Sequence, residues 1–137
     1  MGTVNVGLDC QVALDGVGYW IEPRGYRARR PRLRKATVTA GGGEVYVDAG
    51  PGKRVWTFTV LALNGLTRYD GRHAGLSGSD YRDALAATYA KIGPLPFVDP
   101  RGGAWNVHVD DLVETLPDGR VGLDAPAYLL RVELVEA

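Results

Sequence analysis

Two histidines and a pair of aspartates are the side chains of this sequence that could bind a metal ion. His108 is followed closely by Asp110 and Asp111, and an imidazole beside carboxylate oxygens is a common ligand set for divalent metals. The surrounding residues alternate like a β-strand, which would send the two aspartates to opposite faces. His73 lies far away in the sequence. We therefore expect no metal site, and we expect His108 to lie on the surface or in an interface.

Motifs for nucleophilic catalysis or phosphate binding are not apparent in the rest of the sequence. Residues 75–79 read GLSGS and lack the Gly-x-Ser-x-Gly spacing of a nucleophile elbow. The run Gly41 to Gly43 is followed neither by Lys-Ser or Lys-Thr nor by a helix pattern, as a phosphate-binding loop would be. Cys10 is the single cysteine and suits a small buried side chain. We predict that the protein is not an enzyme and uses no cofactor.

A run of cationic side chains stands out from this background. Residues 24–35 read RGYRARRPRLRK and contain no acidic residue. Its seven cations are the candidate interface residues of the chain: Arg24, Arg27, Arg29, Arg30, Arg32, Arg34 and Lys35. Such a run suits the phosphates of a nucleic acid, the carboxylates of a protein partner, or a solvated loop. We expect it to form an extended arm.

Charge along the chain is divided between two poles. The 137 residues hold 16 basic and 16 acidic side chains, so the formal net charge is zero. Residues 24–35 carry +7, which leaves −7 for the rest, and residues 99–137 alone hold eight acids against three bases. Opposite poles on one small subunit favour head-to-tail association, which closes into rings or continues as filaments. The division therefore favours a contact between copies over free nucleic-acid binding.

Size and hydropathy indicate one domain over residues 1–137. A hydrophobic content of 45% is ordinary for a chain that buries a single core. No apolar run approaches the ~20 residues that cross a bilayer as a helix, so we expect no membrane association.

Three tryptophans could line a sugar-binding platform, but their apolar neighbours favour places in the core: Trp20, Trp56 and Trp105.

Short β segments separated by turns account for most of the chain. Strands are expected at residues 4–8, 17–22, 36–49 (two segments around Gly41 to Gly43), 54–63, 104–114 and 128–136. Residues 79–92 change to a helical period, with Ser79 as the N-cap. The expected buried stripe of this helix contains Tyr81, Leu85, Thr88, Tyr89 and Ile92. The predicted fold is mainly β, a β-sandwich or barrel-like domain with one α-helix at about residues 79–92.

The order of these elements resembles small structural proteins of long-tailed bacteriophages. An early hairpin and the basic arm precede an R-x-W-x-F-x-V strand, one helix, an F-V-D-P-R-G-G-x-W-N-V segment and a final Y-x-L-R-V-E-L-V-E strand. The likeness is to minor tail proteins, above all to the N-terminal β-sandwich domain of distal tail proteins, which is itself similar to the tail-tube fold. The matching pieces are residues 54–63, 80–92, 97–109 and 128–136.

The resemblance implies a structural function in the virion tail, with assembly in the host cytoplasm. Distal-tail proteins form hexameric rings, so it implies a homo-oligomeric adaptor ring that joins the tail tube to the baseplate or tip. The implied partners are tube and hub proteins, with DNA passing transiently through the lumen. A tail-tube or tube-terminating subunit fits the same likeness. Two alternatives come from other classes: a small nucleic-acid-binding β-barrel that uses the basic arm, and a carbohydrate-binding module.

Overall fold

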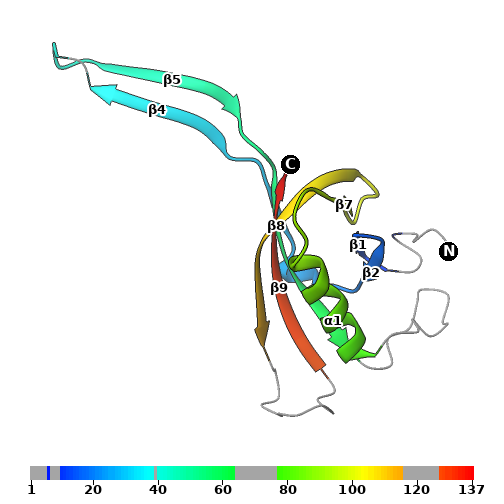
Figure 1. Cartoon of the computed structure of the whole chain (residues 1–137). Helices are drawn as coiled ribbons and strands as arrows, with labels where there is room; N and C mark the ends of the chain where they lie inside the picture. The colour runs from blue at the N-terminus through cyan, green and yellow to red at the C-terminus, as the bar shows by residue number, and fades with distance from the viewer. Residues whose placement is uncertain (1–5, 7–9, 39, 64–76, 116–126) are drawn as a thin grey trace.

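Most of the chain folds into one antiparallel sheet and one helix. The computed structural model describes residues 6, 10–38, 40–63, 77–115 and 127–137. Seven strands form the sheet in the order β2-β1-β7-β8-β9-β6-β3. Their bounds are β1 Val12–Leu14, β2 Val17–Tyr19, β3 Arg27–Arg29, β6 Val55–Leu63, β7 Leu95–Val98, β8 Ala104–Thr115 and β9 Ala127–Glu136. The mainly β class with one helix, as predicted from the sequence, is confirmed (Figure 1).

The sheet curls until its two ends meet, which makes the domain barrel-like. The chain leaving β2 runs along β6, where Leu61 N donates to Trp20 O at 2.7 Å and Glu22 N donates to Thr59 O at 2.9 Å. Ile21 forms an antiparallel bridge with Val60 between these two hydrogen bonds. Since β2 begins the strand order and β6 lies next to its end, these contacts close the sheet on itself.

Alternating apolar side chains of the long strands fill the interior. Along β6 the alternate residues Trp56, Phe58, Val60 and Ala62 are all buried. The same holds for the last strand, whose buried residues are Tyr128, Leu130, Val132 and Leu134. The ring of Phe97 from β7 lies against both aromatic rings of β6, with centroid distances of 5.3 Å to Trp56 and 5.9 Å to Phe58.

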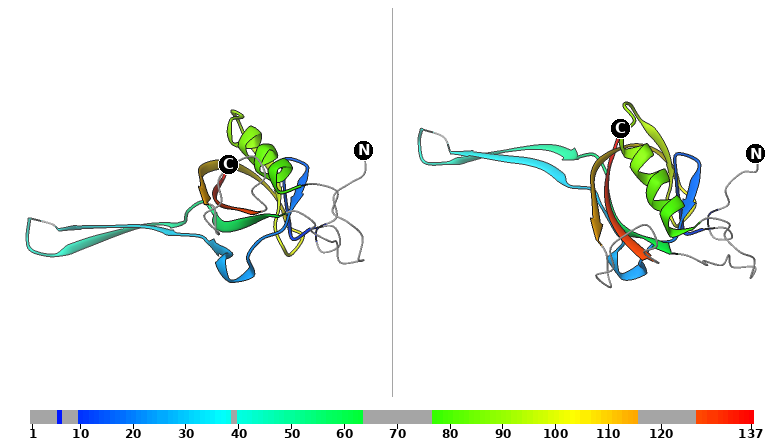
Figure 2. Two further views of the ribbon diagram at one scale, coloured as in Figure 1. Left: turned by 90° about the horizontal axis from the view of Figure 1, so that it is seen from below. Right: turned by 60° about the horizontal axis from the view of Figure 1, so that its bottom comes forward.

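Helix α1 (Gly78–Tyr89) covers one side of this core (Figures 1 and 2). Tyr81, Leu85 and Thr88 are buried, and the ring of Tyr81 lies 6.0 Å from that of Tyr19. The helix begins and ends earlier than the predicted 79–92. Tyr89 and Ile92 are exposed and not buried as expected, because the helix ends before Ile92 and its inward stripe is narrower. Within the described ranges, no helix is long and apolar enough to span a membrane.

The N-cap of α1 is Ser77, so the prediction of Ser79 was wrong. The Ser77 hydroxyl accepts a hydrogen bond from Asp80 N at 3.1 Å, and the Asp80 carboxylate accepts one from Ser77 N at 3.2 Å. This reciprocal pair satisfies two backbone N–H groups that the first turn of a helix leaves without partners. Ser79 lies inside the helix, where its side chain has no capping position.

A second, two-stranded sheet projects from the barrel. Strands β4 (Arg32–Val38) and β5 (Glu44–Pro51) pair with each other and form a hairpin around Gly41 to Gly43, as the sequence predicted (Figure 1). Both further views show this hairpin running away from the other elements (Figure 2). We call residues 32–51 the β4–β5 arm.

The β4–β5 arm continues the ladder that β3 forms with β6. Arg29 lies opposite Val55 in that ladder, and Arg32 lies opposite Pro51 at the start of the arm. Between these pairs, Gly52 N donates to Pro31 O at 2.6 Å, and Arg30 Nε donates to Gly52 O at 2.9 Å. The β3–β6 ladder at the edge of the barrel thus continues into the β4–β5 ladder of the arm.

Candidate interaction surfaces

The seven cations of residues 24–35 are divided between two places. Arg24 lies in the short helix η1 (Pro23–Gly25), Arg27 and Arg29 lie in β3, and Arg30 lies at the root of the arm. The other three, Arg32, Arg34 and Lys35, lie in β4. The expected extended arm at residues 24–35 is therefore wrong in its extent, since residues 27–29 pair with β6. The role of these seven residues in an interface stays a prediction.

Tyr26 explains why the first half of the basic run stays on the barrel. Its ring stacks on that of Phe58, with centroids 6.5 Å apart and planes inclined by 28°. Burial, with a smaller contribution from the nearby Asp99 carboxylate, raises the pKa of the Tyr26 hydroxyl. The anchored tyrosine leads the chain into β3, so the projecting part can begin only after residue 29.

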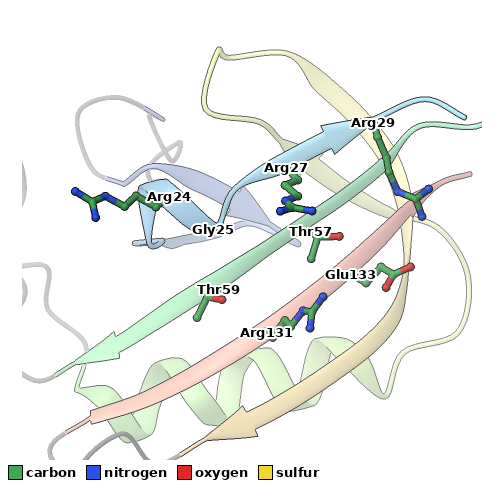
Figure 3. Close-up of a pocket in the computed structure, with 8 residues that line it drawn as sticks. All are labelled: Arg24, Gly25, Arg27, Arg29, Thr57, Thr59, Arg131 and Glu133. Atoms are coloured by element: carbon green, nitrogen blue, oxygen red, sulfur yellow. The ribbon is translucent and has the colours of Figure 1, made fainter.

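Four arginines are among the residues that line a groove on the outer face of the barrel (Figure 3). The groove has a volume of about 530 Å³ and lies over η1, β3, β6 and β9. Thr57 and Thr59 alternate in β6 with the buried Trp56 and Phe58, so the groove faces away from the core and α1. We call it the arginine groove and define it by its lining: Arg24, Gly25, Arg27, Arg29, Thr57, Thr59, Arg131 and Glu133.

The arginine groove carries an excess of positive charge. Its lining holds four arginines and one carboxylate, that of Glu133, and the side chain of Arg24 points away from the others (Figure 3). Strand register brings Arg27 beside Thr57 and Thr57 beside Glu133 in one row across the sheet. Among the described residues, the four groove arginines form no ion pair, whereas Arg32, Arg54 and Arg82 each bind a carboxylate. The groove therefore suits an anionic partner.

Sequence reasoning missed half of the groove. Thr57, Thr59, Arg131 and Glu133 were not candidate site residues, although they occupy the outward positions of two strongly alternating strands. Knowing that β6 lies between β3 and β9 would have placed these positions beside Arg27 and Arg29. That neighbourhood depends on pairing between segments about 75 residues apart, as in Thr57 with Glu133, which local patterns do not encode.

The β4–β5 arm is nearly neutral, unlike the basic run 24–35 that was expected to form an extended arm. Residues 32–51 hold three basic and two acidic side chains. Arg32 binds Asp48 through Nη2 at 2.6 Å and Nε at 2.9 Å, and Gly50 N donates to the same carboxylate at 2.9 Å. The hydrogen bonds from Arg32, and then that from Gly50, lower the pKa of Asp48. Leu33 beside this pair is 55% exposed.

Acidic side chains lie along the distal half of β8. A β-bulge after Val109 interrupts the alternation, so Val109 and Leu112 both pack against the core. Asp110 and Asp111 are consequently both exposed, and the prediction that they face opposite sides was wrong. His108 is exposed, as expected. Within the described part of the chain, no three His, Cys, Asp or Glu side chains are grouped as metal ligands.

One edge of β8 is left without a neighbouring strand over part of its length. β7 pairs with residues 104–107 only, whereas β9 continues along the other edge to Thr115. The second edge of residues 108–115 therefore faces no described strand. Glu114 in this stretch binds Arg82 of α1, which raises the pKa of the guanidinium. Asp110 and Asp111 form no ion pair with any described residue. We call residues 108–115, which include these two aspartates, the acidic edge.

The other candidates from the sequence have structural explanations where the structure describes them. Cys10 is buried, as predicted, and Ser77 of the GLSGS segment caps α1. His73 lies outside the described residues. Trp56 is buried, and Trp105 lies against it at 5.5 Å while its Nε1 donates to Asp99 at 2.9 Å. Trp20 and Trp105 are only partly buried, so the expected core position is confirmed for Trp56 alone.

Comparisons with known proteins find distant likenesses of shape among solved structures. No family model matches the chain, and no curated protein matches it. A solved structure described as the tail of an empty GTA particle, computed with helical refinement and C6 symmetry, has a TM-score of 0.45 and 10% sequence identity. The match covers 98% of this chain and 95% of that chain. What this chain does must therefore be inferred from its own residues.

Proposed function

We propose that the chain is a structural subunit of a bacteriophage-type tail, which acts by self-assembly and not by catalysis. The observation that carries this proposal is the β4–β5 arm. Its strands pair only with each other in the described sheet, and an isolated two-stranded hairpin is marginally stable in water. An arm of this kind gains stability when it lies against another molecule. The large exposed side chain of Leu33 supplies apolar contact area for such docking.

The resemblance of the sequence to distal tail proteins supports a more specific place for this subunit. We propose an adaptor ring, formed by several copies, that joins the tail tube to the baseplate or tip. A hexamer is the expected ring, with tube and hub proteins as its neighbours and DNA passing transiently through the lumen. The subunit would assemble in the host cytoplasm and remain in the virion tail. A tail-tube or tube-terminating subunit is the nearest alternative position.

Removing the arm tests the proposal. Residues 32–51 are replaced by Asn-Gly, so that a tight turn joins Pro31 to Gly52 across the hydrogen bond that they already share. We expect the full chain to form rings and stacked rings, and the armless variant to lose the larger assemblies. Light scattering and negative-stain electron microscopy measure both outcomes. The variant is expected to keep the circular dichroism spectrum of a folded β protein.

Gly41→Ala is the matched control, because a Cβ at this position of the hairpin turn meets no other atom within 4 Å. This variant keeps the arm and is expected to assemble as the wild type does. Two results would count against the proposal: normal assembly of the armless variant, or a full chain that stays monomeric at every concentration tested.

A further inference from the structure

We propose that the arginine groove receives the acidic edge of a second copy of this chain. The inference rests on the proposed function only in requiring that copies assemble, and it names the surfaces that meet. Arg27 and Arg29 belong to β3, an end strand of the sheet, and Asp110 and Asp111 belong to the exposed stretch of β8. This contact is separate from the one that the β4–β5 arm makes.

The arginine groove has an excess of positive charge that no ion pair with a described residue neutralises. Arg24, Arg27, Arg29 and Arg131 are all exposed, and Glu133 is the single carboxylate in the lining. Other arginines of this chain do pair with a carboxylate of the same molecule: Arg54 lies 3.4 Å from Glu136, and Arg32 lies 2.6 Å from Asp48. The guanidinium groups of Arg27, Arg29 and Arg131 lie near one another and repel, and the attraction of an anionic partner offsets this repulsion (Figure 3).

The acidic edge has complementary properties. The bulge places Asp110 and Asp111 together at the surface, and neither carboxylate has a cationic partner among the described residues. The same stretch of β8 presents backbone N–H and C=O groups along its free edge, which can pair with another strand. Charge and backbone thus both make this edge a surface on which a second chain can dock.

Within one molecule the two surfaces adjoin, but they form no ion pair with each other among the described residues. Asp111 lies opposite Glu133 of the groove lining, whereas strands β9 and β6 separate it from Arg27 by three strand spacings, roughly 14 Å. Two unlike surfaces that form no ion pair with each other on one subunit can be satisfied by neighbouring copies, in a heterologous contact that repeats around a ring or along a filament. Nucleic-acid phosphates would also suit the groove, but they would leave the acidic edge without a partner.

Charge reversal on each surface tests the contact. The groove variant is Arg27→Glu with Arg29→Glu, and the edge variant is Asp110→Arg with Asp111→Arg. All four side chains are exposed, so both variants are expected to fold, as circular dichroism would verify. Each variant then presents like charges on both surfaces, and we expect its self-association to weaken about 100-fold.

Mixing the variants gives the decisive measurement. The reversed groove of one variant matches the reversed edge of the other, and the two unchanged surfaces also match. An equimolar mixture should therefore reassemble with alternating subunits, and native mass spectrometry should find even-numbered closed assemblies with equal numbers of each chain. The control is Lys53→Glu with Arg101→Glu. It makes the same change in net charge as the groove variant, at exposed positions outside the groove, and should assemble normally.

The possible failures are distinguishable from one another. If the wild type and both variants all assemble, the groove contact is wrong while the proposed function stands. If the wild type never assembles, both fall. If each variant is monomeric and the mixture stays monomeric, pairing of groove with edge is overturned. The last measurement is the binding of a fluorescent single-stranded oligonucleotide at increasing salt concentrations. Binding that the groove variant alone loses would make the groove a phosphate site and overturn the contact between copies.

Discussion

Ser77 and Asp80 hold the start of α1 by accepting hydrogen bonds from each other's backbone N–H groups. We predict that Ser77→Ala lowers the free energy of unfolding by about 1 kcal/mol, because one N–H of the first turn loses its acceptor. Urea denaturation monitored by tryptophan fluorescence measures the loss. Ser79→Ala is the control and should change stability by less than about 0.5 kcal/mol, since alanine favours the helix interior. Equal losses in the two variants would contradict this assignment of the cap.

The sequence contained the signal that separates these two serines. A capping box needs an acidic or amide side chain three residues after the cap. Asp80 stands in that position relative to Ser77, whereas Arg82 stands there relative to Ser79. The partners of the arginines carried no comparable signal. Arg32 finds its carboxylate 16 positions away, and Arg54 finds one 82 positions away. Which cations remain available for a partner molecule could therefore not be predicted.

At the scale of elements, the pair Arg32–Asp48 fastens β4 to β5 at the base of the arm. Hydrogen bonds from Arg32 and Gly50 lower the pKa of Asp48 below its ordinary 3.8, so the ionised carboxylate favours the paired arm. This stabilisation is fully present above pH 3.8 and is lost as the pH falls through the lower value of the folded arm. We predict that amide chemical shifts of β4 and β5 change in this acidic range as the arm loosens.

Asp48→Asn serves as the control for that titration, because its amide cannot ionise. Its arm should resemble the acidified wild type at every pH, and its amide shifts should not follow the same transition. The same acid transition in both proteins would mean that another group controls the arm.

The two β segments of the arm could be predicted, but neither their projection from the barrel nor the root of the arm could. Two β segments around Gly41 to Gly43 were evident from alternation and turn residues, and the structure confirms them. The two halves of the basic run look alike in sequence, since arginines alternate with smaller residues in both. What separates them is the ring of Tyr26 on Phe58 and the free side of β6, to which residues 27–29 pair. Both are contacts between segments about 30 residues apart.

At the scale of the whole molecule, the described core contains no side chain of the β4–β5 arm. We therefore predict that the armless variant retains the free energy of unfolding of the full chain to within about 1 kcal/mol, with a similar dependence on urea. Leu85→Ala provides the contrast, because Leu85 is buried between α1 and the sheet and its truncation should cost about 2–5 kcal/mol. A loss of that size in the armless variant would show that the arm belongs to the cooperative core.

Local periodicity determines the strand positions, the buried faces and the single helix. The mainly β fold class could be predicted for that reason. Closure of the barrel could not. It depends on residues 20–22 reaching β6, about 40 positions further along the chain, where the local pattern of either segment reads only as strand. The arginine groove is a product of the same closure, because it brings η1 and β3 beside β6 and β9.

The turn of the hairpin lies at the far end of the ribbon from the core, and a Cβ at Gly41 or Gly42 would meet no neighbouring atom. Residues can therefore be inserted or removed there without repacking the barrel. Adding two residues to each strand would keep every side chain on its own face and lengthen the ribbon by about 7 Å. The length of the β4–β5 arm can therefore be changed in steps of two residues per strand. If the arm docks on another molecule as proposed, its length would set the spacing between the barrel and that molecule.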